Sequence, residues 1–273
     1  MIGIFDSGFG GLSVLREIER ELSGLSYVYL GDNARAPYGD KDQATIYQYT
    51  KEAIDYLFSN YPNLKLIILA CNTASAEALR KLQQEYLPKA YPKHNLLGVI
   101  RPVAEEAVLI SENKKIAVIG TQATVSSGTY VEELKLQNPN SVIYQQACPL
   151  LVPLVEESQE ESEAAKLILE QYLEMIKKED FDTIILGCTH YSFLKKKIDS
   201  FFKGKKKIVD GAIIVASKLA KYLTRHPEYL EQDNLAQQKI FLTTGNQKKF
   251  EQAAEKFLGR KINCQNINLS SRL

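Results

Sequence analysis

Short apolar runs rich in β-branched residues alternate with amphipathic segments along the chain, and this alternation limits the fold more than any other feature. Apolar runs separated by helical patterns are typical of parallel strands that helices cover on both faces. Strands are predicted at residues 2–5, 27–30, 64–70, 95–100, 115–120, 142–144, 182–186, 206–209 and 239–242. Helices are predicted at residues 12–22, 43–59, 74–86, 103–111, 160–178 and 192–202. The expected fold class is therefore α/β with mainly parallel sheets.

Two segments within this pattern are near copies of each other. Residues 67–73 are Ile-Ile-Leu-Ala-Cys-Asn-Thr, and residues 184–190 are Ile-Ile-Leu-Gly-Cys-Thr-His, so each apolar run carries a cysteine at its carboxyl end. A strand followed by a polar loop precedes each copy at a similar distance. We therefore predict two similar doubly wound domains that face each other across a cleft. The alternative is chance, because any doubly wound fold repeats strand–helix units.

The repeat also suggests how the chain is divided. Residues 1–96 plus 209–273 are predicted to form the first domain, and residues 97–208 the second. The crossover is expected at residues 95–100, and the last part of the chain is expected to return to the first domain.

Composition excludes several classes of function. Hydrophobic residues make up 45% of the 273-residue chain, which allows a large core, and the formal net charge is only +1. So balanced a charge gives no general attraction to nucleic acids or anionic membranes. The chain has no apolar run long enough for a membrane span and no secretory signal pattern at its start. No two of the three histidines have metal-ligand spacing. We expect a cytoplasmic protein without metal, cofactor, nucleic-acid or membrane partner.

Cys71 and Cys188 are the main candidates for chemistry. A free cysteine is often only a small buried hydrophobe, but each of these precedes a predicted helix, whose N-terminal dipole favours the thiolate. A modest lowering of the thiol pKa would make either one a base near neutral pH. His190 is close enough in sequence to hold the proton or the charge of Cys188. Cys148 and Cys264 lack a strand-to-helix setting and are expected to be structural.

Polar loops after other strands complete the candidate site. Asp6 opens a glycine-rich turn before a helix, where it is either a cap or a group that orients a substrate ammonium or tunes a thiol. The loop at 31–39 holds Tyr38 between Pro37 and Gly39, and the segment 120–130 is rich in hydroxyls. Glu156 ends an apolar, proline-broken run, as a helix cap or as a polar group at the cleft edge.

Taken in order, these segments resemble bacterial glutamate racemases within the aspartate/glutamate racemase superfamily. The resemblance is carried by residues 6–8, 37–39, 71–75, 120–130, 148–156 and 187–191. The histidine at position 190 favours the glutamate branch, because aspartate racemases tend to have a glutamate there. The family usually continues with a proline where this chain has Ser192, in the first turn of a predicted helix, and we expect that change to leave the chemistry intact.

The resemblance implies a two-domain racemase that works without a cofactor and supplies D-glutamate for peptidoglycan. Cys71 and Cys188 would donate and accept protons, Asp6 would assist Cys71, His190 would assist Cys188, and Glu156 would lie near the second thiol. The residues that would bind the substrate are Asp6, Ser7, Tyr38, Gly39, Asn72, Thr73, Thr189 and His190. Two alternatives stay open, a racemase of aspartate or another small amino acid and a non-catalytic ligand-binding protein. A homodimer is a further expectation.

Overall fold

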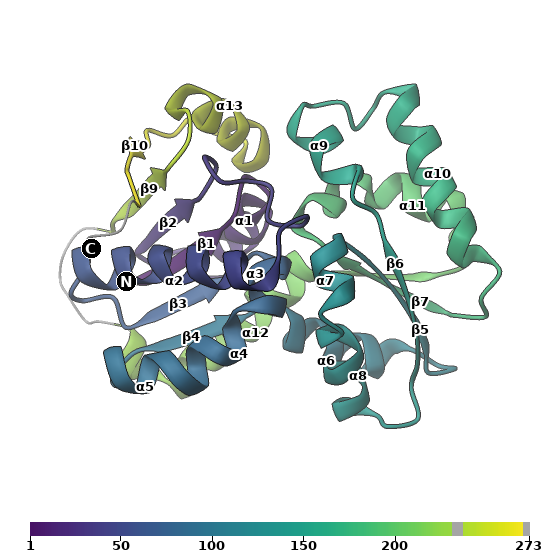
Figure 1. The fold of residues 1–273 in the computed structure, drawn as a ribbon, viewed down its shortest axis with the longest axis horizontal. Coiled ribbons are helices and arrows are strands. Elements are labelled where there is room, and N and C mark those ends of the chain that lie inside the picture. The colour runs from purple at the N-terminus through teal and green to yellow at the C-terminus, as the bar shows by residue number, and fades with distance from the viewer. Residues whose placement is uncertain (231–236, 270–273) are drawn as a thin grey trace.

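The computed structural model describes residues 1–230 and 237–269, which form two parallel sheets side by side (Figure 1). The first sheet has six strands in the order β10-β9-β2-β1-β3-β4, and the second has four in the order β6-β5-β7-β8. Every pair of neighbouring strands is parallel. The predicted fold class is confirmed.

Strands β1 to β9 overlap the predicted apolar runs, because runs of valine, isoleucine and leucine fill both faces of a covered sheet. Strand β6 extends beyond its predicted end, and β10 was not predicted. The strands of the first sheet are β1 (Ile2–Asp6), β2 (Tyr27–Gly31), β3 (Leu66–Leu69), β4 (Asn95–Gly98), β9 (Lys239–Thr243) and β10 (Gln265–Asn266). The strands of the second sheet are β5 (Lys115–Gly120), β6 (Val142–Ala147), β7 (Thr183–Gly187) and β8 (Lys207–Asp210).

Helices connect these strands and cover both sheets (Figure 1). The α-helices are α1 (Gly11–Glu21), α2 (Gln43–Asn60), α3 (Asn72–Glu77), α4 (Leu79–Lys81), α5 (Leu87–Ala90), α6 (Ile100–Ile110), α7 (Gln122–Ser126), α8 (Thr129–Gln137), α9 (Leu151–Glu156), α10 (Glu163–Lys177), α11 (Lys195–Phe201), α12 (Gly211–Arg225) and α13 (Gln247–Leu258). The other helical segments are a π-helix, η1 (Leu82–Tyr86), and two 3-10 helices, η2 (Thr189–Leu194) and η3 (Pro227–Tyr229).

Several helices begin at side chains that satisfy their free backbone N–H groups. Asp42 accepts a hydrogen bond from the backbone N–H of Thr45 at the start of α2, and Ser162 does the same for Ala165 at the start of α10. A cap of this kind stabilises a helix by about 1 kcal/mol. None of the helices among the described residues is both long and apolar enough to cross a lipid bilayer.

The order of the four central strands is the same in both halves. The first sheet contains β2-β1-β3-β4, and the second is β6-β5-β7-β8, so each element recurs four strands later. In each half the chain runs to one side of the first strand and then returns to its other side. The strand order therefore reverses between β1 and β3, and again between β5 and β7. Ligands bind at such points in open α/β sheets.

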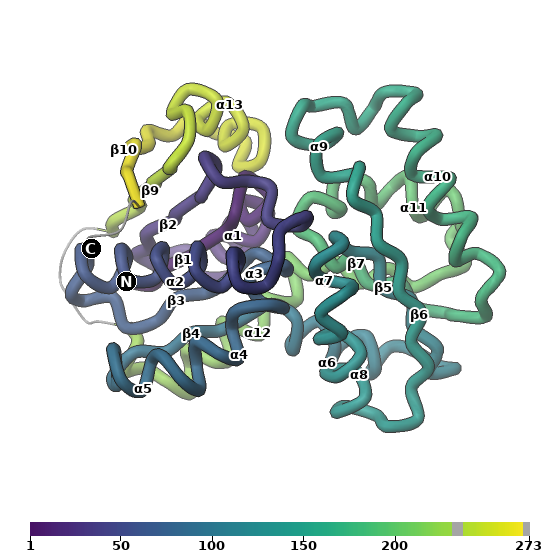
Figure 2. Tube along the Cα trace, in the orientation of Figure 1, coloured from purple at the N-terminus to yellow at the C-terminus, as the bar shows by residue number. Residues whose placement is uncertain are grey.

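The C-terminal part of the chain serves both halves. Strand β8 belongs to the second sheet, and α12 packs against α1 and α6. Strands β9 and β10 then extend the first sheet beyond β2, as the yellow segment beside the purple one shows (Figure 2). The predicted range 209–273 includes residues 231–236 and 270–273, which lie outside the described residues.

The segment 95–100, predicted both as a strand and as the crossover, contains the end of the first sheet and the start of the next helix. Residues Asn95–Gly98 form β4, which pairs with β3 at the edge of the first sheet. After Val99 the chain enters α6, which packs on β7 and β8 of the second sheet. The chain therefore passes from the first sheet to the second half within this segment.

One hydrophobic cluster extends through both halves. It joins Ile4 of the first sheet to Ile185 of the second through buried residues of α1, α6 and α12. Two further clusters fill the outer faces, one between the first sheet and α2, and one between the second sheet and α10. The contact between the halves is thus part of the core.

Candidate active site

The two points of strand reversal face each other, and a thiol stands at each. Cys71 follows β3 after one residue, and Cys188 follows β7 directly. Both cysteines are buried and free of disulfides. They line one cavity of about 20 Å³ between the sheets. Its walls are Ser7, Pro37, Tyr38, Gly39, Cys71, Asn72, Thr73, Thr121, Val152, Glu156, Cys188, Thr189 and His190.

Cys71 is the N-cap of α3. Its sulfur accepts a hydrogen bond from the backbone N–H of Ala74 at 3.4 Å and lies 3.3 Å from the hydroxyl oxygen of Ser7. A cysteine at this position is expected to have a lowered pKa. That expectation is wrong here, because burial and the nearby carboxylate of Asp6 raise the pKa of Cys71 to about 12. The contacts with Ser7 and Ala74 act in the opposite direction but are weaker. Cys71 therefore keeps its proton at neutral pH.

Cys188 begins a 3-10 helix, η2, and its side chain makes no capping hydrogen bond. Its sulfur instead lies 3.7 Å from Nδ1 of His190. The other ring nitrogen, Nε2, forms an ion pair at 3.3 Å with Oε1 of Glu156, in an orientation that falls short of a hydrogen bond. The imidazole therefore lies between a sulfur and a carboxylate.

This position decides the charge of His190. Burial alone would lower its pKa, but the contacts with Cys188 and Glu156 outweigh burial and raise the pKa of His190 to about 10. The ring is therefore a cation at neutral pH. Glu156 is the last residue of α9 and lines the cavity, so it is a polar group at the cleft edge, the second of the two roles considered for it.

Asp6 lies at the end of β1 and is completely buried. One carboxylate oxygen accepts a hydrogen bond from the backbone N–H of Gly8 at 2.8 Å, and the other has no hydrogen-bond partner among the described residues. Burial raises the pKa of Asp6, while the His190 cation opposes that rise. Asp6 is not part of the cavity wall, so its effect on the site is electrostatic in this arrangement.

Glycines let the first half approach the second. A Cβ at Gly10 would lie 2.1 Å from Oγ1 of Thr189 and 2.8 Å from the ring of His190. A Cβ at Gly8 would lie 2.9 Å from Oε1 of Glu156. The glycines of the turn before α1 therefore make room for η2 and α9.

A second row of contacts closes the opposite side of the cavity. The backbone N–H of Ala123 donates to the carbonyl of Gly39 at 2.9 Å. The hydroxyl oxygen of Thr73 lies 3.0 Å from that of Thr121 and 3.3 Å from that of Thr124. Gly39 and Thr73 belong to the first half and the other three residues to the second, so these bonds form only when the halves are together.

The remaining predicted residues lie at the cavity, with partners that the sequence did not reveal. The hydroxyl of Tyr38 donates to Asp32. The side-chain oxygen of Asn72 accepts a hydrogen bond from Tyr130 at 2.7 Å. Thr121 and Val152 also line the cavity but were not singled out. Thr121 and Tyr130 belong to the hydroxyl-rich segment 120–130, and that composition was the available signal.

The setting of Cys148 differs from the prediction. Strand β6 reaches Ala147, so Cys148 does lie between a strand and a helix, like the two candidate thiols. The sulfur, however, contacts the carbonyl of Gln146 at 3.6 Å and is buried in the core of the second half. It does not line the cavity. A structural role for Cys148 and Cys264 stays a prediction.

Ser192, the residue that departs from the expected pattern, lies in η2. Its hydroxyl donates to the carboxylate of Asp210 at 2.8 Å, which links η2 to the cap of α12. The hydroxyl makes no contact with either candidate thiol.

Comparison with known proteins agrees with this geometry. The sequence profile of the Asp/Glu/Hydantoin racemase family matches residues 2–219. The chain belongs to this family. It is 45% identical to a glutamate racemase of Sulfurihydrogenibium over 89% of this chain and 88% of that protein. Racemases are isomerases, and the predicted resemblance is therefore confirmed.

Two solved structures match over almost the full length. A glutamate racemase isoform from Bacillus anthracis has a TM-score of 0.91 and 35% identity, with 98% of this chain and 97% of that chain covered. The glutamate racemase of Francisella tularensis, solved in complex with D-glutamate, has a TM-score of 0.88 and 29% identity at the same coverage.

Proposed function

We propose that this protein is a cofactor-independent glutamate racemase in which Cys71 and Cys188 transfer protons at opposite faces of the substrate Cα. The observation that carries the proposal is that thiols from two similar sheets line one cavity. The relatives named glutamate racemase, one of them bound to D-glutamate, support glutamate as the substrate.

Inversion at Cα requires that one group removes a proton and another delivers one from the opposite side. Cys71 holds its proton at neutral pH, since its pKa is raised to about 12, and can act as the donor. The His190 cation, 3.7 Å from the sulfur of Cys188, stabilises negative charge there and favours the role of base. The roles reverse for the other enantiomer. A turnover that starts with Cys188 as the base leaves Cys188 protonated and Cys71 as the thiolate, and a turnover of the other enantiomer reverses this change. Asp6 and His190 are the nearby titratable groups that can also restore the first state.

Removing the Cα proton also requires donors for the charge that develops on the neighbouring carboxylate. The cavity wall offers the hydroxyls of Ser7, Thr73 and Thr189 and the amide of Asn72. Hydrogen bonds from such groups to a carboxylate are among the stronger ones in proteins. We assign these residues to substrate binding, with Tyr38 and Gly39 closing the wall between them.

The size of the cavity implies a motion. About 20 Å³ holds little more than one water molecule, far less than a five-carbon dicarboxylate. We therefore propose that the two halves separate to admit glutamate and close before proton transfer. The rim between α9 and α13 is held by exposed ion pairs such as Lys249 with Glu157. The rim between α3 and α7 is held by buried hydroxyls, and we expect it to open less readily.

Incubation with L-glutamate in D₂O tests the proposal. We expect D-glutamate to form with deuterium at Cα, without added cofactor, and Cys264→Ser to behave as the wild type because that thiol lies outside the cavity. L-Aspartate should be converted much more slowly. Absence of deuterium at Cα would rule out racemase activity. Faster turnover of L-aspartate than of L-glutamate would show that aspartate is the substrate.

We propose further that the enzyme works in the cytoplasm, where thiols stay reduced, and supplies D-glutamate for peptidoglycan. Depletion of the enzyme in a host that depends on it should then create a requirement for D-glutamate.

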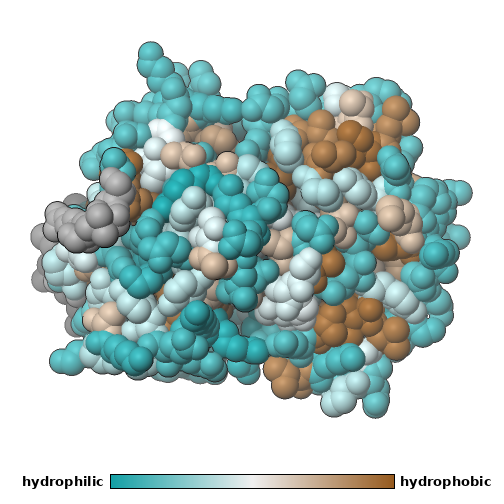
Figure 3. Space-filling view, viewed as in Figure 1, coloured by the Kyte–Doolittle hydropathy of each residue, from teal (hydrophilic) through white to brown (hydrophobic). Residues whose placement is uncertain are grey.

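The proposed domains are residues 1–96 plus 209–273 and residues 97–208. A homodimer is proposed because apolar side chains gather on the second half (Figure 3), and Leu136 and Leu167 are among those exposed. Sedimentation equilibrium would measure the mass of the protein in solution and would distinguish a dimer from a monomer.

A further inference from the structure

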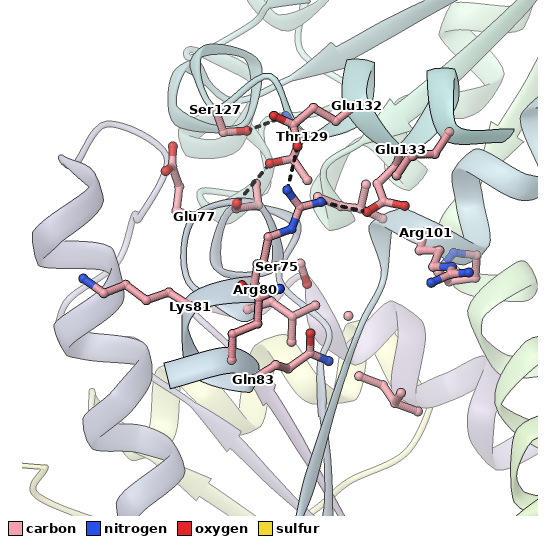
Figure 4. A pocket seen from close by; sticks show the side chains of 18 of the residues that line it. Ser75, Glu77, Arg80, Lys81, Gln83, Arg101, Ser127, Thr129, Glu132 and Glu133 are labelled. Carbon is pink, nitrogen blue, oxygen red and sulfur yellow. Dashed lines mark hydrogen bonds and ion pairs between the residues drawn. The ribbon is translucent and has the colours of Figure 1, made fainter. Parts of the chain in front are cut away.

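The start of α8, in the second half, contacts α3 and α4 of the first half. The hydroxyl of Thr129 donates to the carbonyl of Ala76 at 3.1 Å, and Arg80 forms an ion pair with Glu132 at 2.8 Å (Figure 4). The turn that leads into α8 uses Gly128, whose φ of +70° other residues rarely adopt. This turn brings Tyr130 against the start of α3.

The hydroxyl of Tyr130 is fully buried and donates to Oδ1 of Asn72 at 2.7 Å. Burial raises the pKa of Tyr130 far above its ordinary value, so the hydroxyl keeps the proton that it donates. Across the part of the chain that the structure describes, this is the hydrogen bond found on the Asn72 side chain. Its NH₂ group is therefore left for another acceptor.

An amide has an acceptor end and a donor end on opposite sides of the same planar group. With the oxygen held by Tyr130, the NH₂ end is the one available at the cavity that Asn72 lines with the two thiols. A substrate carboxylate can only accept hydrogen bonds. A rotated amide would present its oxygen to that carboxylate and repel it.

We infer that Tyr130 is a positioning residue, which turns the NH₂ group of Asn72 toward a carboxylate of the substrate when the two halves are closed. The inference rests on the proposed function. Tyr130 and Asn72 belong to different halves, so a motion that separates α8 from α3 would break their bond and let the amide rotate. The contact between the halves on this side of the cavity thereby holds the amide in the orientation that the carboxylate needs.

Tyr130→Phe removes the hydroxyl and leaves the ring in place. Because the NH₂ group would lose its fixed orientation toward a charged carboxylate, we expect KM for both enantiomers of glutamate to rise about tenfold, with kcat changed less than about threefold. Thr129→Val is the matched control, because it removes a bond at the same contact that does not involve Asn72. Its KM should stay within about twofold of the wild type. Thermal unfolding of both variants checks that the fold is retained.

A double-mutant cycle separates positioning from general support of the structure. If Tyr130 acts through Asn72, adding Tyr130→Phe to Asn72→Ala leaves KM no higher than in Asn72→Ala alone. Additive effects, or an unchanged KM in Tyr130→Phe while the wild type racemises glutamate, would overturn the inference and leave the proposed function intact. A wild type that exchanges no Cα proton would overturn both.

Discussion

Cys71 and Cys188 occupy the same place in two similar sheets, yet their surroundings differ in charge. Cys71 is the cap of an α-helix and lies beside a hydroxyl, with the buried carboxylate of Asp6 behind it. Cys188 begins a 3-10 helix and lies beside an imidazolium that a second carboxylate holds. The repeated strand order sets the position of each sulfur, and Asp6 at the end of β1, His190 in η2 and Glu156 at the end of α9 set the charge environments.

The comparison shows how two chemically identical thiols can take different roles, one as an acid and the other as a base. An enzyme that moves one proton in and one proton out needs an acid and a base at the start of each turnover. The negative environment of Cys71 favours the thiol, whereas the group beside Cys188 is the His190 cation. In the same way, the environments of two carboxyl groups can separate their pKa values, so that one acts as an acid and the other as a base.

Replacing the sulfur of either cysteine should have the largest effect on activity. It should also remove the acid–base difference between the Cys71 side and the Cys188 side of the cavity. Because each turnover needs one acid and one base, we expect Cys71→Ser and Cys188→Ser each to lower kcat for both enantiomers by at least about 10³-fold. Circular dichroism of the substrate would follow racemisation. Wild-type activity in either variant would show that one thiol suffices.

His190→Asn should weaken the Cys188 side more than the Cys71 side. Removing the cation next to the sulfur of Cys188 is expected to lower kcat by about 10²-fold. The pKa of Cys71 should stay raised by burial, and His190 influences it only indirectly, through the charge of Asp6. Alkylation rates of Cys71 measured against pH would report that pKa. Equal disturbance of both thiols would show that His190 does not act mainly on Cys188.

The same residue predicts a pH dependence of stability. The folded pKa of His190, about 10, lies above the ordinary value of about 6.5, so the folded state binds this proton more tightly than the unfolded state. Its contribution is complete below pH ~6.5 and is lost as the pH rises toward about 10. Urea unfolding of the wild type and His190→Asn should therefore converge over that range. A gap that widens with pH would contradict the assignment.

Asp6→Asn should act on the Cys71 side and have a smaller effect. Burial would still raise the pKa of Cys71, but without the carboxylate the pKa should fall below about 12. We expect kcat to fall about tenfold, since the fold and both sulfurs remain. Thiolate absorbance during a pH titration would report the shift. An unchanged titration of Cys71 would mean that Asp6 does not influence it.

Ser192→Pro should have the smallest effect and restores the residue usual in the family. It removes one hydrogen bond to Asp210, which costs about 1 kcal/mol of stability, while kcat stays within about twofold. Thermal unfolding and turnover measure the two quantities. A large loss of kcat would show that η2 must be held by α12 for His190 to work.

The sequence allowed prediction of the strands and of the two thiols at their ends. Uninterrupted apolar runs such as Ile-Ile-Leu before Cys71 and Cys188 strongly predict a buried strand. Strand β6 was harder, because its last residues, Gln-Gln-Ala, carry no strand pattern, and its true length brought Cys148 into an unexpected setting. The two-residue strand β10 has no sequence signal either.

The chemistry of the site could be predicted less well than its location. A helix start suggests a lowered thiol pKa, but the pKa of Cys71 depends on how completely the second half excludes water from it. The partnership of Tyr130 with Asn72 depends on the packing of α8 on α3. Both follow from contacts between distant segments, and local patterns hold no information about such contacts.

The hydrophobic cluster that passes from Ile4 to Ile185 has a consequence for cooperativity. Because α1, α6 and α12 bury their side chains in one shared core, neither half can unfold while the other keeps all its contacts. Calorimetry should show a single heat-absorption peak instead of two. The boundary across which we propose that the substrate enters is therefore also part of the shared hydrophobic core.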